Sequence, residues 1–200
     1  MNPSDIGKAY DQITHLWTRD AFDRANGITA HRKALQFVTT HRGVALDVGC
    51  GCTGRFAELL ISEGFQVQGV DVSEKMISLS REKYPDITFH CADICQWQLP
   101  TRYDFITAWD SIWHVPLNRQ QNVIEKLVNG LNPGGVLIFS FGGTAASDEH
   151  TNHHMGVEMY YATLGTEGAL AVLLKLDCFV RHLEYEQHPE KHAFVVVEKT

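Results

Sequence analysis

The sequence has 200 residues, a formal net charge of −7 and five cysteines, which suits one domain with a sizeable core over residues 1–200. The negative charge and the absence of a Lys or Arg run argue against nucleic-acid partners, and no apolar run approaches the ~18 residues of a membrane helix. Because the first residues contain no apolar signal core, we expect a cytoplasmic protein whose cysteines are reduced.

Two amphipathic helices are predicted before the first strand. Apolar residues recur at spacings of three and four over about residues 4–26, and Gly27 is a plausible stop for this helix. A second helix is predicted over about residues 30–40 and leads into the strand.

The stretch VALDVGCGCTG, residues 44–54, predicts a buried strand, a glycine turn and the start of a helix. Gly49, Gly51 and Gly54 fit the pattern G-x-G-x-x-G, which lets the chain turn sharply and lets a nucleotide approach the backbone. That pattern alone is a weak signal, but Asp47 lies two residues before the first glycine. An acid there would oppose a pyrophosphate and suit a cationic amino group, so the implied ligand is a nucleoside with an ammonium-bearing tail. The alternative is a tight turn without a ligand.

This stretch resembles the first motif of the Rossmann-like, or class I, S-adenosylmethionine (SAM) methyltransferases, in which D-x-G-x-G surrounds the methionine end of the cofactor. The resemblance implies that Asp47, Gly49, Cys50 and Gly51 bind SAM and its product S-adenosylhomocysteine (SAH). Cys50 and Cys52 form C-x-C, but both lie inside the turn, so we interpret them as packing residues and predict no metal site.

The next predicted strand ends at Asp71, about 20 residues beyond the glycine turn, where a ribose-binding acid belongs. A carboxylate there can accept hydrogen bonds from both ribose hydroxyls. Ser73 is predicted to cap the following helix. The stretch VDVSEKMISLSREKY matches the second motif of the family, so the resemblance assigns Asp71 and Val72 to the cofactor and places Met76 against the adenine. Ordinary core packing is the alternative for Met76.

The third predicted strand, residues 87–91, leads into a loop that contains Asp93 and Ile94. The resemblance implies that Asp93 accepts a hydrogen bond from the adenine amino group and that the backbone of Ile94 donates one. A loop aspartate that caps a turn is the alternative.

The fourth predicted strand ends in WDSIWHVP at the carboxyl edge of the sheet, where ligands of open α/β sheets bind. Trp109 is assigned to the cofactor. Asp110, Ser111 and His114 follow at the place where the family handles its acceptor. His114 could take a proton near neutral pH and Asp110 could position it, whereas Ser111 is a substrate candidate. The alternative is that His114 is a turn residue and that Asp110 caps the next segment.

Beyond the fifth predicted strand, residues 142–160 are predicted to form a loop over the pocket, since residues 142–156 are polar, glycine-containing and rich in histidine. Its Asp, Glu and His cluster matches no strong metal motif, so a substrate-specificity loop is favoured and His153 is a substrate candidate. The family resemblance also implies that residues 1–40 form a helical cap, with Tyr10 and Trp17 as candidate substrate residues; packing on the core is the alternative for both.

The last segments predict a helix over residues 166–175 and two strands joined at His188, Pro189 and Glu190. A terminal hairpin is what closes the sheet of the methyltransferases that the chain resembles. We therefore predict an α/β fold with a doubly wound, mostly parallel seven-stranded sheet, an antiparallel last strand, and helices on both faces.

The function favoured by these patterns is methyl transfer from SAM to a small-molecule acceptor, by a monomer or homodimer without nucleic-acid or membrane partners. A nicotinamide-dependent oxidoreductase shares the glycine turn, but Asp47 and the L-N-P-G-G segment argue against it. A non-catalytic SAM-binding regulatory module is the third possibility, because it would also need Asp47 and Asp71. Neither the acceptor nor the attacked atom follows from the residues.

Overall fold

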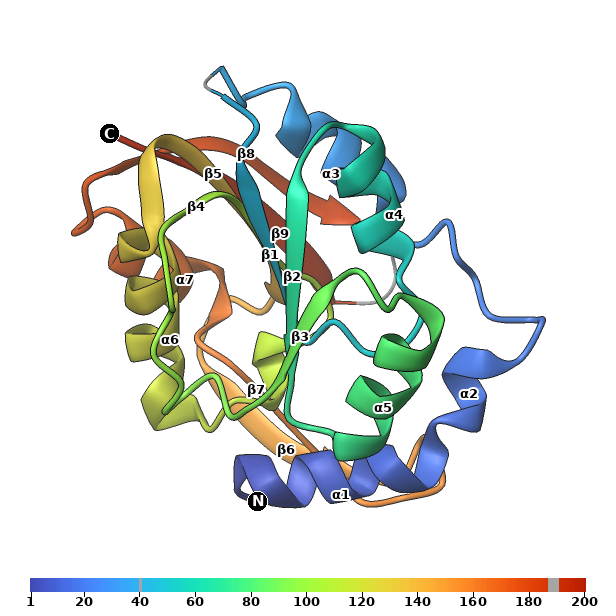
Figure 1. Cartoon of the computed structure of the whole chain (residues 1–200). Coiled ribbons are helices and arrows are strands. Elements are labelled where there is room, and N and C mark those ends of the chain that lie inside the picture. The colour runs from blue at the N-terminus through green and yellow to red at the C-terminus, as the bar shows by residue number, and fades with distance from the viewer. Residues whose placement is uncertain (40, 187–190) are drawn as a thin grey trace.

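A seven-stranded sheet forms the centre of the protein, whose computed structural model describes residues 1–39, 41–186 and 191–200 (Figure 1). Five neighbouring strands are parallel, and the last strand of the chain is antiparallel to both of its neighbours. The predicted fold is therefore confirmed. In spatial order the strands are β3 (Thr88–Cys91), β2 (Gln66–Asp71), β1 (Val44–Val48), β4 (Tyr103–Ala108), β5 (Leu131–Gly142), β9 (His192–Lys199) and β8 (Cys178–Glu186).

Helices cover both faces of this sheet (Figure 1). On one face, α3 (Ile28–Leu35) and α4 (Arg55–Ser62) pack on the central strands. On the other face, α6 (Leu117–Asn129) and α7 (Gly165–Leu173) do the same. α5 (Glu74–Lys83) lies beside β2 and β3. Because both faces are covered, the middle strands are apolar almost throughout, as a buried parallel sheet requires.

The N-terminal segment differs from its prediction. One long helix was expected up to Gly27, but α1 (Pro3–Ile13) and the short α2 (His15–Thr18) end well before it. Polar side chains hold the segment between α2 and α3: Asp23 accepts from the backbone of Ala25, and Arg24 donates to the backbone of Thr53. Gly27 begins α3 as its N-cap, with φ of +80°, and does not stop a helix. Thr40, the expected end of the second helix, lies outside the described residues, and α3 ends at Leu35.

Residues 142–160 also differ, because they contain more than a loop. β6 (Asp148–Asn152) pairs antiparallel with β7 (Met159–Thr163) in a separate two-stranded sheet. Apolar side chains of β7 pack against the buried side of α1, and Figure 1 shows this hairpin beside that helix. Because β6 contains only polar residues, its sequence shows no alternation of apolar and polar residues that would predict a strand. Its partner β7 supplies the apolar face that makes the hairpin part of the domain.

The predicted terminal hairpin is present as β8 and β9, whereas His188, Pro189 and Glu190 lie outside the described residues. Among the helices that the structure describes, none combines the length and apolar character needed to cross a membrane.

Candidate functional site

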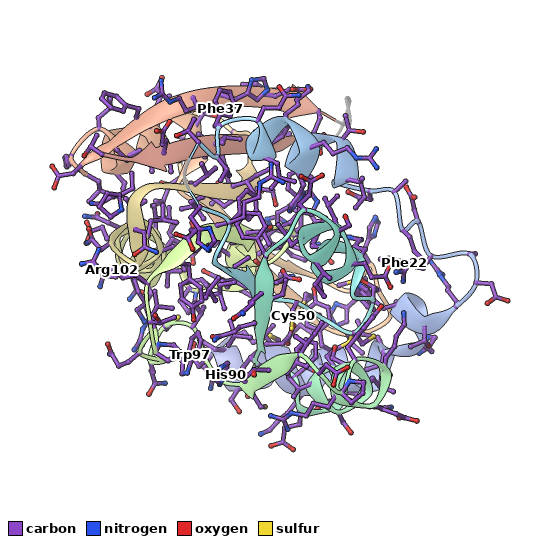
Figure 2. The ribbon with its side chains drawn as sticks, turned by 45° about the horizontal axis from the view of Figure 1, so that its top comes forward. Phe22, Phe37, Cys50, His90, Trp97 and Arg102 are labelled. Atoms are coloured by element: carbon purple, nitrogen blue, oxygen red, sulfur yellow. The ribbon has the colours of Figure 1, made fainter. Side chains whose placement is uncertain are left out.

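A cavity of about 540 Å³ lies at the carboxyl ends of β1, β2 and β4. Its walls come from the glycine turn, α1, the segment between α2 and α3, the 3₁₀ helix η1 (Ile112–His114) and the β6–β7 hairpin. Phe22, after α2, and Cys50, in the glycine turn, both line it and are labelled in Figure 2. The volume lies within the range of about 300–1,000 Å³ that is common for small-molecule sites, and open α/β sheets bind ligands at this edge.

The glycine turn brings the backbone to the floor of the cavity. Gly49 has φ of +71°, and a Cβ atom there would lie 2.3 Å from the Cβ of Ser111. Only glycine therefore lets the turn and η1 approach each other this closely. Gly51 has φ of +54°, and a Cβ atom there would meet nothing within 4 Å. Both glycines line the cavity, so the turn leaves room for a ligand against its backbone.

Asp71 lies at the end of β2, and backbone donors orient its carboxylate. Gly51 N donates to Oδ2 at 2.9 Å and Ser73 N donates to Oδ1 at 2.8 Å. Burial raises the pKa of Asp71, while these N–H groups and that of Val72 act in the opposite direction. Each carboxylate oxygen keeps a further lone pair, so the group can still accept from a ligand that carries hydroxyls. Asp71 and Val72 both line the cavity.

Ser73 connects this wall to two helices. Its Oγ accepts from the backbone N of Met76 at 3.1 Å, which confirms the predicted N-cap of α5. The same hydroxyl donates to Asp11 Oδ1 on α1 at 2.6 Å. A Cβ on Gly7 would lie 2.6 Å from the carbonyl oxygen of Val72, so α1 lies directly against this end of β2. The N-terminal helix thus lies at the edge of the cavity.

The residues assigned to the adenine all belong to the cavity wall. Met76, Asp93 and Ile94 all line it. The turn-capping alternative for Asp93 is also present, because Cys95 N donates to its Oδ1 at 2.8 Å and Gln96 Nε2 donates to its Oδ2 at 2.9 Å. The two roles are compatible, since each oxygen can accept more than one hydrogen bond.

Asp110 lies in a strained position beyond the end of β4. It is the non-glycine residue with positive φ, +52°, among the described residues. Its Oδ1 lies 2.9 Å from His192 Nε2, and its Oδ2 lies 3.7 Å from Arg55 Nη2. Its backbone N donates to Ser140 Oγ at 2.7 Å. Strain of this kind persists where the surroundings fix the residue, and it is common at functional sites.

His114 is buried at the cavity wall, and three groups surround its ring. Nδ1 lies 2.7 Å from the carbonyl oxygen of Tyr160. Nε2 lies 2.7 Å from the hydroxyl of Tyr10 and accepts from Trp113 Nε1 at 3.1 Å. Burial lowers the pKa of His114 to about 4, although the Tyr160 carbonyl and Asp110 act in the opposite direction. The imidazole is therefore neutral at pH 7.

Most of the predicted site residues come together around this cavity. Those that line it are Tyr10, Trp17, Gly49, Cys50, Gly51, Asp71, Val72, Met76, Asp93, Ile94, Trp109, Asp110, Ser111 and His114. Ser111 Oγ is buried and has no hydrogen-bond partner within the described part of the chain. Trp17 packs edge-on against Tyr10, with ring centroids 5.2 Å apart.

Asp47 and His153 lie elsewhere. Asp47 is only 4% exposed, pairs in register with Gly69 and Thr107 on the neighbouring strands, and is not part of the cavity wall. Burial raises the pKa of Asp47 to about 7, with Arg55 opposing that rise. His153 is exposed between β6 and β7 and does not line the cavity either. Each was predicted to touch a ligand; Asp47 instead lies inside the sheet, and the hairpin turns His153 outwards.

Sequence reasoning missed several residues of the cavity wall. Arg55, the first residue of α4, lines it with its guanidinium over the rings of Phe56 and Phe22 at 4.5 and 5.3 Å. Its Nε is buried without a hydrogen-bond partner among the residues described. The sequence does place a cationic residue directly after the glycine turn, and this could have indicated Arg55 as a wall residue. Met155 and Tyr161 also line the cavity, and no local pattern in the hairpin indicated this.

The described residues contain no group of three or more His, Cys, Asp or Glu side chains that could hold a metal ion. The cavity does offer what a SAM-type ligand needs. It has an open glycine backbone, an oriented carboxylate at Asp71, and the apolar side chains of Met76 and Ile94 in its wall.

Comparisons with known proteins agree with this geometry. Residues 45–135 match the family described as "Methyltransferase domain". A ubiquinone biosynthesis O-methyltransferase of Idiomarina loihiensis is 29% identical over 152 residues, which cover 70% of this chain and 60% of that protein. The chain therefore spans about three fifths of the length of that curated relative.

Two solved structures show the same fold. The PH0226 protein from Pyrococcus horikoshii OT3 has a TM-score of 0.72 and 21% identity, with 90% of this chain and 93% of that chain covered. Magnesium protoporphyrin IX methyltransferase from Synechocystis PCC 6803, solved with bound SAM, has a TM-score of 0.73 and 17% identity, with 100% and 98% covered. The matched domain, the fold and the glycine turn with Asp71 beside it are together similar to those of class I SAM-dependent methyltransferases.

Proposed function

We propose that this chain transfers a methyl group from SAM to a small-molecule acceptor by in-line displacement. The observation that carries the proposal is the carboxylate of Asp71, which backbone donors from Gly51 and Ser73 orient at the wall of a ligand-sized cavity. A fixed carboxylate beside an open glycine turn suits a ribose with two free hydroxyls.

The cofactor half of the cavity is proposed to work as follows. Asp71 accepts from the ribose hydroxyls, and Val72, Met76, Asp93 and Ile94 hold the adenine. The backbone of Gly49, Cys50 and Gly51 and the ring of Trp109 hold the methionine end, and Asp47 lies behind the turn, where its pKa of about 7 leaves it partly ionised at neutral pH. When bound, SAM supplies a methyl group that its positive sulfur already activates.

The acceptor half lies around Tyr10, Trp17, Ser111 and His114. His114 and Asp110 are both proposed to serve catalysis, but separately, because Asp110 contacts His192 and Arg55 whereas His114 contacts Tyr10, Trp113 and Tyr160. The chain has to hold the acceptor in line and exclude water, and positioning of this kind can lower a barrier by about 7–11 kcal/mol in good intramolecular cases. α1 and the β6–β7 hairpin close this half, since Tyr10 and Tyr161 come from them. His153 could contact an acceptor only if the β6–β7 hairpin changed its conformation.

Two measurements test the function. Calorimetry should show that the purified chain binds SAH. Turnover with tritium-labelled SAM should then label one class in a panel of small hydroxyl, amine, thiol and carboxylate compounds. A chain that binds no SAH at millimolar concentration would contradict the proposal, whereas binding without any turnover would favour a regulatory SAM-binding module. Near-ultraviolet absorbance of NADH bound to the purified protein would favour the oxidoreductase alternative.

The remaining expectations stay predictions. They are a cytoplasmic location, a monomeric or homodimeric state, and the lack of nucleic-acid and membrane partners. Size-exclusion chromatography with light scattering would decide between the two oligomeric states.

A further inference from the structure

The hydrogen bonds around His114 fix which of its ring nitrogens carries a hydrogen. Nδ1 lies 2.7 Å from the carbonyl oxygen of Tyr160 on β7. A carbonyl oxygen can only accept, so Nδ1 must be the protonated nitrogen of the neutral ring. Nε2 is then left with a lone pair, and it can only accept.

Two groups meet that lone pair. Trp113 Nε1, which can only donate, lies 3.1 Å from Nε2, and the hydroxyl of Tyr10 lies 2.7 Å from it. The Tyr10 hydroxyl must therefore point its hydrogen at His114. A proton added to Nε2 would face the N–H of Trp113, which has no lone pair with which to receive it. This opposition and the burial of the ring both keep His114 neutral.

The direction of the Tyr10 hydrogen determines what this side chain can offer to a ligand in the cavity. Its ring is half-buried and packs edge-on between Trp17 and His114, at centroid distances of 5.2 and 5.4 Å. Because its own hydrogen is directed to His114, the Tyr10 oxygen can offer the cavity only its lone pairs. Burial, together with the charges of Asp71 and Asp110, raises the pKa of this phenol well above its usual value, so it stays un-ionised.

We propose that Tyr10, and not His114, meets the methyl acceptor, and that the acceptor is a neutral nucleophile that still carries a hydrogen, a hydroxyl or an amine. This inference rests on the proposed methyl transfer. Lone pairs on Tyr10 attract an O–H or N–H hydrogen and repel a thiolate or carboxylate. The acidic side chain of Asp71 on the same cavity adds to that repulsion, whereas the charge of Asp110 is balanced by Arg55 at 3.7 Å. His114 is then a positioning residue, which keeps the hydrogen of Tyr10 turned away from the acceptor.

For a hydroxyl acceptor the proton has a path. As the new carbon–oxygen bond forms and the carbon–sulfur bond breaks, the electron pair of the broken bond remains on sulfur. The acceptor's hydrogen stays hydrogen-bonded to a lone pair of the Tyr10 oxygen during the step, and the methylated oxonium then releases that proton to water, so His114 remains neutral. A neutral amine reacts in the same way, because its proton also leaves the methylated product afterwards.

The first test reads the hydrogen positions without any acceptor. Histidine ¹⁵N spectra at pH 7 should show His114 with hydrogen on Nδ1, its signal being identified by its loss in His114→Gln. The Nε2 resonance should shift in Tyr10→Phe and stay in place in the control Tyr185→Phe, which removes a phenol hydroxyl that bonds Thr166 away from the cavity. Hydrogen on Nε2 in the wild-type protein would overturn the proposal.

The second test measures selectivity and the role of Tyr10. The probes are catechol and aniline, which are neutral with hydrogen at pH 7.5, and thiophenol and benzoate, which are mostly anionic. Turnover should be confined to the first pair. Tyr10→Phe should lower kcat by about tenfold or more, the worth of one hydrogen bond, with the Kd for SAH unchanged. Methylation of thiophenol or benzoate alone, or full activity of Tyr10→Phe, would contradict the inference.

The outcomes also separate this inference from the proposed function. A wild-type chain that fails to bind SAH refutes the methyltransferase function itself. A chain that binds SAH and methylates only the anionic probes retains the function and loses the inference. If no probe is methylated, the ¹⁵N result decides, because the proposal requires hydrogen on Nδ1.

Discussion

Replacing Asp71 by alanine should weaken SAH binding and loosen the glycine turn at the same time. The carboxylate accepts from Gly51 N and Ser73 N at 2.9 and 2.8 Å, and it is proposed to accept from the ribose as well. Loss of a charged partner for the ribose hydroxyls should cost about 1.5–3 kcal/mol, or roughly ten- to a hundredfold in affinity. Loss of the two backbone bonds should lower the free energy of unfolding by about 3 kcal/mol, the low end for two such bonds, because Asp71 is only half-buried.

Two assays separate these effects. Calorimetry gives the Kd for SAH, and urea unfolding without ligand gives the free energy of unfolding. Asp71→Asn should be intermediate in both, because an amide oxygen can still accept from one backbone N–H but carries no charge. Asp86→Ala removes an exposed carboxylate outside the cavity and should change neither value. A folded Asp71→Ala protein with wild-type affinity for SAH would refute the assignment of this residue.

The remaining predictions concern pH, catalysis and closure. Burial lowers the pKa of His31 to about 3 from an ordinary 6.5, so the unfolded chain binds more protons between these values and the free energy of unfolding should fall on acidification. From pH 6.5 to 5 this amounts to about 2 kcal/mol in urea unfolding, and the loss should shrink in His31→Gln but not in the exposed His15→Gln. His114→Ala should lower turnover by about tenfold if His114 only positions Tyr10, and by roughly 10²–10⁴ if His114 itself takes the proton, while SAH affinity barely changes; full turnover would exclude both roles. Hydrogen exchange in α1 and residues 142–156 should slow when SAH and acceptor are bound, and equal protection in both states would exclude a lid.

The cofactor half could be predicted because its signals are local. A glycine turn, an acid at the end of the next strand and a serine at a helix start are each determined by a few neighbouring residues. Ser73 and Asp71 therefore lie where the sequence indicates, and Asp71 also holds Gly51 across about 20 residues of chain. Asp47 shows the limit of this reasoning. Its spacing from the glycines was clear, but spacing alone did not reveal that the side chain lies inside the sheet and not at the cavity wall.

The environment of Asp110 could not be predicted, because its partners come from distant strands. Ser140 contacts it from the neighbouring parallel strand β5, and His192 contacts it only after the antiparallel strand β9 joins the sheet. The hairpin of residues 148–163 escaped prediction for a related reason. Its β6 strand is polar on both sides, so its pairing with β7 depends on the cover that α1 provides.

Similarity to relatives gives little information about the acceptor, because residues that shape the acceptor half of the cavity lie outside the matched region. The matched family region, residues 45–135, contains the glycine turn, Asp71 and His114. Tyr10 and the carbonyl of Tyr160, the two groups that decide what His114 does, lie outside it on α1 and β7. A histidine at the end of the fourth strand can be recognised from sequence, but its tautomer depends on a backbone oxygen 46 residues away. The acceptor of this chain therefore has to be inferred from its own α1 and β6–β7 hairpin, even though the matched region contains the glycine turn and Asp71.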